Sequence, residues 1–331
     1  MAKKITIADI ARVIGISPTT VSFVLNKKND KGISSETRDK VLSVAEKLGY
    51  RPKVKISRVG WIRAIFLVRN LTAFNYHTTF YSGVYNYLSK TCSENNIELS
   101  MGEFPYEDDK DFILSYKKFA EDGYDVFLCN DPRIVTFLKK MNHKVVLVQS
   151  DRMDDTICIH CDDFAAGTKA AMYAYKMGHR RAGLICHGLD GERMKGFMTT
   201  FTSLGGVCDD KYVWDVDWEL HELESVVAEK SKSPDLPSFF YCFSDNMLFY
   251  AIRGFAKNNI RVPDDVSIMG TDNLYWGRLN NPAFTTIDLN ELLFGEKLLE
   301  SIKHAYDGNS TYHLAVPVNL VERETVKKIT E

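Results

Sequence analysis

The stretch Ile5–Asn26, "ITIADIARVIGISPTTVSFVLN", predicts two short helices joined by a tight turn. Thr6 and Ser17 can each accept a hydrogen bond from the free backbone N–H groups at the start of a helix. Pro18 suits the first position of the second helix, because its missing N–H would have no partner there. Gly15 permits the turn between the helices. The apolar residues that recur at helical spacing are Ile7, Ile10, Ala11 and Ile14, and then Val21, Val24 and Leu25.

A third helix is predicted from Ser34, a suitable N-cap, to Gly49, a suitable stop. Three such helices predict a helix-turn-helix domain, in which the second helix points its N-terminal end into a DNA major groove. A small structural helical bundle is the alternative for the same pattern. The predicted inner face of the third helix consists of Val41, Leu42, Ala45 and Leu48. The outward residues that can bind phosphates or base edges are Thr19, Thr20, Ser22 and Asn26.

Charge is distributed unevenly along the 331 residues. Residues 1–60 contain 13 lysines and arginines and five acids, a net charge of +8. Since the whole chain carries −2, the remainder carries −10. A basic head on an acidic body is typical of a protein that binds nucleic acid. A merely solvated basic surface is the alternative.

From Arg63 onward, short apolar runs alternate with helical patterns. The first run is "AIFLV", Ala64–Val68, and a second series begins after "TICIHCDD", residues 156–163. This alternation predicts an α/β fold with two lobes, each built on a parallel sheet. In such folds a ligand binds at the carboxyl ends of the strands, in the cleft between the lobes.

The head resembles the DNA-binding domain of the LacI/GalR family of bacterial transcription regulators, through "ITIADIARVIGISPTTVSFVLN" and "ISSETRDKVLSVAEKLGYRP". The body resembles the periplasmic-binding-protein-like effector domain of that family, through "MGHRRAGLI", "ERMKGF", "FSDNMLFYAIRGF", "VPDDVSIMGTDN" and "PAFTTIDLN". The resemblance implies a helix-turn-helix DNA-binding domain over residues 1–52, a hinge linker over 53–62, and an effector-binding and dimerisation core over 63–331. Lobe 1 of the core would comprise about residues 63–158 and 287–316, and lobe 2 about 159–286 and 317–331.

The resemblance also implies which residues of the head bind an operator. Pro18, Thr19 and Phe23 would occupy the base-reading positions. Family members often carry arginine where Phe23 stands, so we expect an altered operator, unless Phe23 packs into the core of the head. The backbone-positioning residues would be Ile7, Ser17, Thr20, Ser22, Asn26, Ser34 and Tyr50. In the linker, phosphate contacts are expected from Lys53 and Lys55, and a wedge into the minor groove from Val54 or Ile56.

Candidate ligand contacts lie at predicted strand ends in the core. Arg193, three residues before Gly196, stands where the family places an effector-contacting arginine. Carboxylates can hold pairs of hydroxyl groups, and an indole can stack on a sugar ring. The candidate residues, which include both kinds of side chain, therefore suit a sugar or sugar derivative as the ligand. Capping and core packing are the structural alternatives for these residues. The candidates are Tyr76, Arg193, Trp218, Ser244, Asp245 and Asp272.

The sequence gives little support for a metal site or for an enzyme active site. Cys158 and Cys161 form the one C-x-x-C, whose odd spacing places the thiols on opposite faces of a strand, and a zinc site needs about four ligands. The paired acids Asp162 and Asp163 are interpreted as turn residues, and His179 as a capping residue. The chain lacks the motifs H-E-x-x-H, G-x-S-x-G and the P-loop. We therefore expect no enzyme, no metal and no cofactor.

These observations predict a cytoplasmic transcription regulator, a repressor controlled by a small ligand in the interlobe cleft. No apolar run approaches the roughly 18 residues of a membrane span, and no signal sequence is recognisable. The alternative is a cytoplasmic sugar-binding protein without specific DNA binding. We expect a homodimer on a pseudo-palindromic DNA operator, and no tetramer, because "VKKITE" at the end is too short for a coiled coil. The sequence decides neither the effector nor whether it induces or corepresses.

Overall fold

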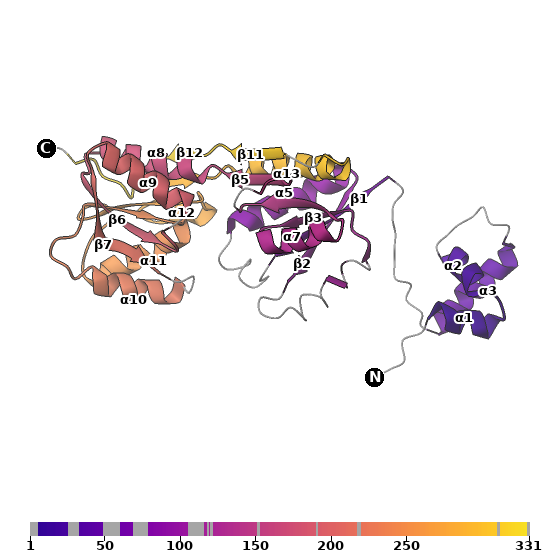
Figure 1. Ribbon diagram of the computed structural model, residues 1–331. Coiled ribbons are helices and arrows are strands. Elements are labelled where there is room, and N and C mark those ends of the chain that lie inside the picture. The colour runs from indigo at the N-terminus through magenta and orange to yellow at the C-terminus, as the bar shows by residue number, and fades with distance from the viewer. Residues whose placement is uncertain are drawn as a thin grey trace. The chain divides into compact units, whose positions relative to one another are not determined.

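The computed structural model describes residues 6–25, 33–48, 60–68, 79–104, 116–117, 119, 122–150, 153–189, 191–216, 220–309 and 312–329. The chain divides into two compact units, Met1–Gly60 and Trp61–Glu331 (Figure 1). The first unit is the head and the second is the core.

The head consists of α1 (Ile7–Ile14), α2 (Pro18–Leu25) and α3 (Ser35–Lys47), as predicted. Gly15 adopts the left-handed conformation, with φ of 78°, and its N–H donates to the carbonyl of Ala11. The helices bury one apolar cluster, and the predicted inward position of Leu42 is wrong, since its side chain is 52% exposed. The buried members of the cluster are Ile10, Ala11, Val21, Val24, Val41 and Ala45.

The first sheet of the core has the strand order β11-β5-β4-β3-β1-β2, and its neighbouring strands pair in parallel. Even-numbered residues of β1, such as Phe66, pack with α5 and α13, whereas Ile65 and Leu67 pack with α7 on the other face. The strands are β1 (Ile62–Val68), β2 (Ile97–Glu103), β3 (Val126–Cys129), β4 (Lys144–Val148), β5 (Ile157–Cys161) and β11 (Tyr312–Val316). The helices are α5 (Thr79–Glu94), α7 (Pro132–Lys140) and α13 (Glu291–Tyr306).

The second sheet has the order β12-β10-β9-β8-β6-β7. Its strands pair in parallel except β12, which runs antiparallel to β10 and so departs from the predicted all-parallel sheet. Helices α8 and α9 pack on one face, and α10 and α11 on the other. The strands are β6 (Arg181–Cys186), β7 (Val207–Asp215), β8 (Phe239–Cys242), β9 (Ser267–Thr271), β10 (Thr286–Asp288) and β12 (Asn319–Val321). The helices are α8 (Asp163–Lys176), α9 (Glu192–Ser203), α10 (Leu220–Lys230), α11 (Asp245–Lys257) and α12 (Tyr275–Leu279).

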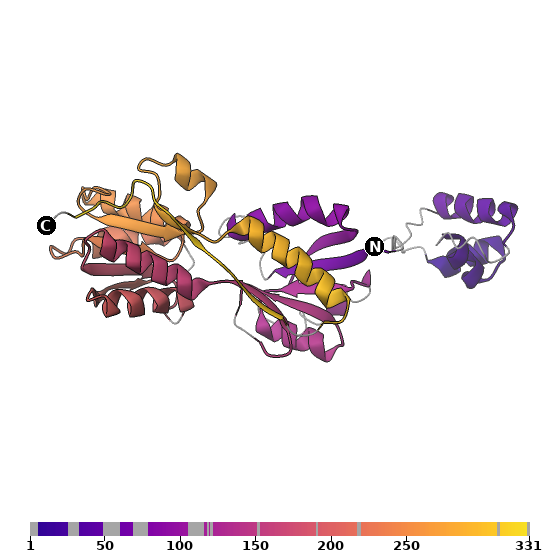
Figure 2. The same cartoon turned by 90° about the horizontal axis from the view of Figure 1, so that it is seen from above.

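Three segments of the chain connect the two sheets. β5 of the first sheet leads into α8, β10 of the second sheet leads into α13, and β11 leads back to β12. Figure 2 shows α13 lying along the first sheet and the extended connection from β11 to β12. One apolar cluster includes residues from both sheets, so the core is continuous through these connections.

The two cysteines of the C-x-x-C lie on opposite faces of β5, as predicted. Cys158 packs in the cluster under α7, and Cys161 packs in the cluster shared by both sheets. Residues of α7 pack on the side of Cys158 and residues of α8 and α13 on the side of Cys161, so both thiols are buried.

Within the described residues, no single helix is long and apolar enough to cross a membrane. The helices α1 and α2 reach sufficient length and apolarity only when joined, and they are bent by 108° at their break.

Candidate nucleic-acid interface and ligand site

The start of α2 is organised by Ser17. Its Oγ accepts a hydrogen bond from the backbone N–H of Thr20 at 3.0 Å and lies 2.8 Å from Thr20 Oγ1. Pro18 occupies the first helical position, and Ser17, Pro18 and Thr19 are exposed. Pro18 has no N–H and the cap uses that of Thr20, so the N–H of Thr19 remains at the positive end of the helix dipole. This end of α2 can therefore receive a phosphate or approach a base edge.

Helices α1 and α3 are capped in the same way. Thr6 and Asp9 form a capping box at α1, in which the backbone N–H of Thr6 donates to Asp9 Oδ2 at 2.9 Å. At α3, Ser34 Oγ accepts from the N–H of Thr37 at 3.2 Å and is exposed. Ile7 is half-buried against the cluster of the head, so its side chain packs and its backbone lies at a helix start.

Phe23 is half-buried on α2, whereas its neighbours Val21 and Val24 are buried. Among the described residues, Phe23 is not a member of the apolar cluster of the head, and Ser22 beside it is also half-buried. Part of the Phe23 side chain is therefore exposed on α2. The predicted DNA contacts Asn26, Tyr50, Lys53, Val54, Lys55 and Ile56 lie outside the described residues.

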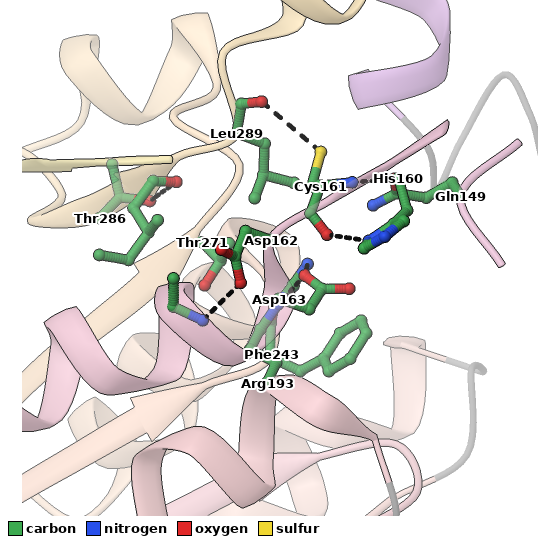
Figure 3. A network of polar contacts seen from close by, with 12 residues as sticks. Gln149, His160, Cys161, Asp162, Asp163, Arg193, Phe243, Thr271, Thr286 and Leu289 are labelled. Atoms are coloured by element: carbon green, nitrogen blue, oxygen red, sulfur yellow. Dashed lines mark hydrogen bonds and ion pairs between the residues drawn. The ribbon is translucent and has the colours of Figure 1, made fainter. Parts of the chain in front are cut away.

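In the core, Arg193 on α9 is buried and paired. Its Nε and Nη2 donate to Asp163 Oδ1 at 3.0 and 2.6 Å, and its Nη1 donates to the carbonyl of Phe243 at 2.5 Å. The guanidinium also lies 4.5 Å from the centre of the Phe243 ring. Figure 3 shows Arg193, Asp163 and Phe243 grouped together.

Close packing of α8 against α9 brings Asp163 and Arg193 together. A Cβ on Gly167 would collide with the carbonyl oxygen of Arg193, and one on Gly196 would collide with the carbonyl oxygen of Phe164. Only glycine at these two positions lets the helix backbones approach so closely. The two glycines therefore set the position of the ion pair.

Ser244 and Asp245 begin α11 directly after β8. Ser244 Oγ accepts from the N–H of Met247 at 3.2 Å and caps the helix. The carboxylate of Asp245 accepts from the N–H of Leu274 at 3.0 Å and from Thr286 Oγ1 at 2.7 Å, and the residue is completely buried. Burial raises the pKa of Asp245 from 3.8 to about 7, although the bonds from Thr286 and Leu274 oppose this. Both side chains thus form hydrogen bonds that stabilise the structure around the strand ends.

Asp272 is the more accessible carboxylate. It follows β9, has a φ of 116° and is half-buried. The N–H of Asp245 donates to its side chain, and its own N–H donates to the carbonyl of Ile287 at 2.8 Å. Burial raises the pKa of Asp272 well above its ordinary value, while the charge of Arg193 acts to lower it and that of Asp245 to raise it. Arg193, Asp245 and Asp272 therefore form one electrostatic group.

The sequence interpretation missed Asp163 and Phe243. Asp162 caps α8, accepting from the N–H of Ala165 at 2.9 Å, as its interpretation as a turn residue implies. Asp163 instead pairs with Arg193. The sequence feature that could have indicated this role is a second carboxylate directly after a strand. Tyr76 and Trp218 lie outside the described residues. Among the residues that are described, no three His, Cys, Asp or Glu side chains are grouped to hold a metal ion.

Comparison with known proteins agrees with this arrangement. Residues 6–53 match the model of bacterial regulatory proteins of the lacI family, and residues 171–326 match that of a periplasmic binding protein-like domain. The transcriptional repressor PurR of Haemophilus influenzae strain PittEE is 24% identical over 339 residues, which cover 98% of this chain and 99% of that protein. The chain belongs to the LacI/GalR family of bacterial transcription regulators.

Solved structures of transcription regulators share the fold. A complex of the transcriptional regulator CelR with cellobiose aligns with a TM-score of 0.70 and 21% identity, covering 97% of this chain and 99% of that one. The lac repressor dimer bound to operator and the anti-inducer ONPF aligns with a TM-score of 0.72 and 18% identity, covering 98% and 100%. These alignments support the two-part architecture of a helix-turn-helix head and a periplasmic-binding-protein-like core.

Proposed function

We propose that this protein is a DNA-binding transcription repressor controlled by a small ligand, a sugar or sugar derivative, that binds at the carboxyl ends of the core strands. The observation that carries the proposal is the capped start of α2, with Ser17, Pro18 and Thr19 exposed, in a head that matches the lacI family. Relatives along the full length are named as transcriptional repressors.

The ligand part of the proposal rests on Asp272, Arg193 and the strand ends around them. Asp272 is half-buried and can accept hydrogen bonds from a pair of hydroxyl groups. The backbone N–H of Asp245 donates to this carboxylate, and Ser244 and Asp245 are kept as candidate ligand contacts from the sequence, although their side chains also bond within the fold. Tyr76 and Trp218 are proposed as further contacts from the sequence. The CelR complex, which contains cellobiose, supports a carbohydrate as the ligand class.

We further propose that the protein acts as a homodimer on a pseudo-palindromic operator. Two heads related by two-fold symmetry read two half-sites of such a DNA. The aligned lac repressor is a dimer on its operator, which supports this assembly. Because ligand and operator bind the same molecule, the occupancy of one must change the affinity for the other by an equal factor.

Operator selection tests the proposal. The purified full-length chain is incubated with a random DNA library, and bound sequences are recovered through several rounds at about 150 mM salt. We expect a two-fold symmetric consensus, and weaker binding as salt rises, because phosphate contacts release counterions. Recovery of no consensus would favour the sugar-binding protein without specific DNA recognition.

A further inference from the structure

The charge of Arg193 is already satisfied within the protein. Its side chain is 5% exposed, and two of its three nitrogens donate to the same carboxylate oxygen of Asp163. The third nitrogen donates to the carbonyl of Phe243, whose ring also lies against the guanidinium. An arginine held in this way has little capacity left to bind a negatively charged ligand group.

A further carboxylate, that of Asp272, lies within electrostatic reach of this ion pair. Asp272 acts electrostatically on Arg193, and it is itself influenced by Asp163 and Asp245. With Asp163 ionised, the group of Arg193, Asp163, Asp245 and Asp272 carries a net charge of zero or below, whatever the protonation of Asp245 and Asp272. Any anion placed here would meet no net positive charge.

We propose that this site selects an uncharged polyhydroxyl ligand or a cationic one, such as an amino sugar, and excludes phosphorylated and carboxylated ligands. Asp163 is the residue that excludes them, acting through Arg193. The inference rests on the proposed function, because it concerns the same ligand site. It narrows the ligand from sugar derivatives in general to those without negative charge.

Displacement of Asp163 by an anionic ligand is disfavoured for a physical reason. Asp163 sits at the first position of α8, and its carboxylate would lose both bonds to Arg193 while remaining near Asp272. An ionised group that loses its hydrogen-bond partner in a partly buried place is destabilised, because little water can replace that partner. A hydroxyl group can instead bind beside the ion pair without breaking it.

Asp163→Asn tests the role of this carboxylate, with Asp162→Asn as the matched control. Asparagine at 163 keeps an oxygen for Arg193 and removes the charge. Asparagine at 162 removes the same charge one residue away, and it still caps α8, because asparagine is as good a cap as aspartate. Thermal unfolding of each full-length variant is followed in potassium phosphate and in potassium chloride of matched ionic strength, so that phosphate binding to the head affects all variants equally.

We expect Asp163→Asn to be stabilised by inorganic phosphate with a midpoint about tenfold lower than that of the unaltered protein or of Asp162→Asn. Adding Arg193→Met to Asp163→Asn should abolish the gain. Circular dichroism of each variant before heating verifies that it is folded. If folded Asp163→Asn gains no phosphate stabilisation, Asp163 is not the excluding residue and the proposal is wrong.

Stabilisation of the unaltered protein by ligands is a second, independent test of the proposal. Glucose 6-phosphate or phosphate that stabilises it saturably, with the effect lost in Arg193→Met, would overturn the proposal. A screen of neutral, aminated and phosphorylated sugars in which stabilising compounds carry no negative charge supports it. If the proposed function is wrong, a different outcome is expected. Operator binding would then be absent, or would not respond to ligand, while the charge preference for ligands persisted.

Discussion

The thiol of Cys161 donates to the backbone carbonyl of Leu289, with sulfur and oxygen 3.6 Å apart. Cys161 ends β5 and Leu289 follows β10, so the contact joins two of the three segments that connect the sheets (Figure 3). The backbone N–H of Cys161 also donates to Gln149 Oε1 at 2.8 Å. Cys161 is therefore a structural residue at the junction of the sheets.

Cys161→Ala should destabilise the core. The substitution removes a buried sulfur from a packed cluster together with its contact to Leu289, which we expect to lower the free energy of unfolding by about 1 kcal/mol. Urea unfolding followed by tryptophan fluorescence measures the change. Cys208→Ala is the matched control, because Cys208 is only half-buried. Equal midpoints for the two variants would contradict a structural role for the Cys161 contact.

Thiol accessibility gives a related expectation. Six of the seven cysteines are buried and Cys208 is half-buried. Burial raises the pKa of Cys161, Cys186 and Cys242 and also that of Cys208, so it is access to solvent that distinguishes Cys208. We expect a chromogenic disulfide reagent to modify Cys208 first in the native protein, and the others only upon unfolding. Rapid modification of several thiols without denaturant would argue against this packing.

Much of the fold could be predicted from the sequence, because apolar spacing reports directly which face of an element is buried. The three helices of the head and the strands β1, β3, β4, β6, β8 and β9 follow such patterns. Leu42 was assigned wrongly because it adjoins the buried Val41, and spacing alone does not define the edge of a helix face. β7 buries Tyr212 and Trp214, but the charged residues Asp209, Asp210 and Lys211 precede them and obscure the strand pattern in the sequence.

The candidate site was less predictable, because its geometry depends on contacts between distant residues. The family motif identified Arg193, yet its partner Asp163 becomes evident only when Gly167 and Gly196 bring α8 and α9 together. Asp245 resembles a ligand contact in sequence, but its partners Leu274 and Thr286 come from later segments. His179 was interpreted as a helix cap, and its buried ring instead bonds with Ser238 Oγ and the carbonyl of Lys327.

Asp245 should make stability depend on pH. Its pKa is about 7 in the folded protein and 3.8 ordinarily, so between these values the unfolded chain ionises while the folded chain retains its proton. The contribution of Asp245 is therefore fully present below pH 3.8 and is lost as pH rises through 7. This difference between the folded and unfolded pKa values of Asp245 corresponds to roughly 4 kcal/mol in the free energy of unfolding.

Asp245→Asn tests this dependence, because the amide does not ionise. Urea midpoints at pH 5 and pH 8 should differ less in Asp245→Asn than in the unaltered protein. Asp264→Asn, which changes an exposed carboxylate, should retain the difference of the unaltered protein. An identical pH dependence in Asp245→Asn would mean that Asp245 is already ionised in the folded state at pH 5.

Asp272→Asn should weaken the response to the ligand and leave the operator affinity of the free protein nearly unchanged. The amide fits the same backbone, since asparagine tolerates positive φ, but it replaces one carboxyl oxygen with an NH₂ group that cannot accept a hydrogen bond, a loss of roughly 1–3 kcal/mol to a bound hydroxyl group. The ligand midpoint should therefore rise by about tenfold or more. Fluorescence anisotropy of labelled operator, titrated with ligand, measures both quantities, with Asp264→Asn as control. An unchanged midpoint would remove Asp272 from the ligand site.

Phe23→Arg should change which bases the head reads. Phe23 is half-buried on α2 beside the buried Val24, so a longer polar side chain can extend outward without entering the core. Arginine can donate two hydrogen bonds to guanine, whereas phenylalanine can contact only apolar groups such as a thymine methyl. Operator selection is carried out with the unaltered protein and with Phe23→Arg. Only Phe23→Arg should enrich guanine at one position of each half-site, a preference of about 1–3 kcal/mol. Ser22→Ala is a useful control, because it should weaken binding to all sequences without changing the preferred base. If Phe23→Arg selects the same consensus and also unfolds at a much lower temperature, Phe23 is a core residue of the head and does not read DNA.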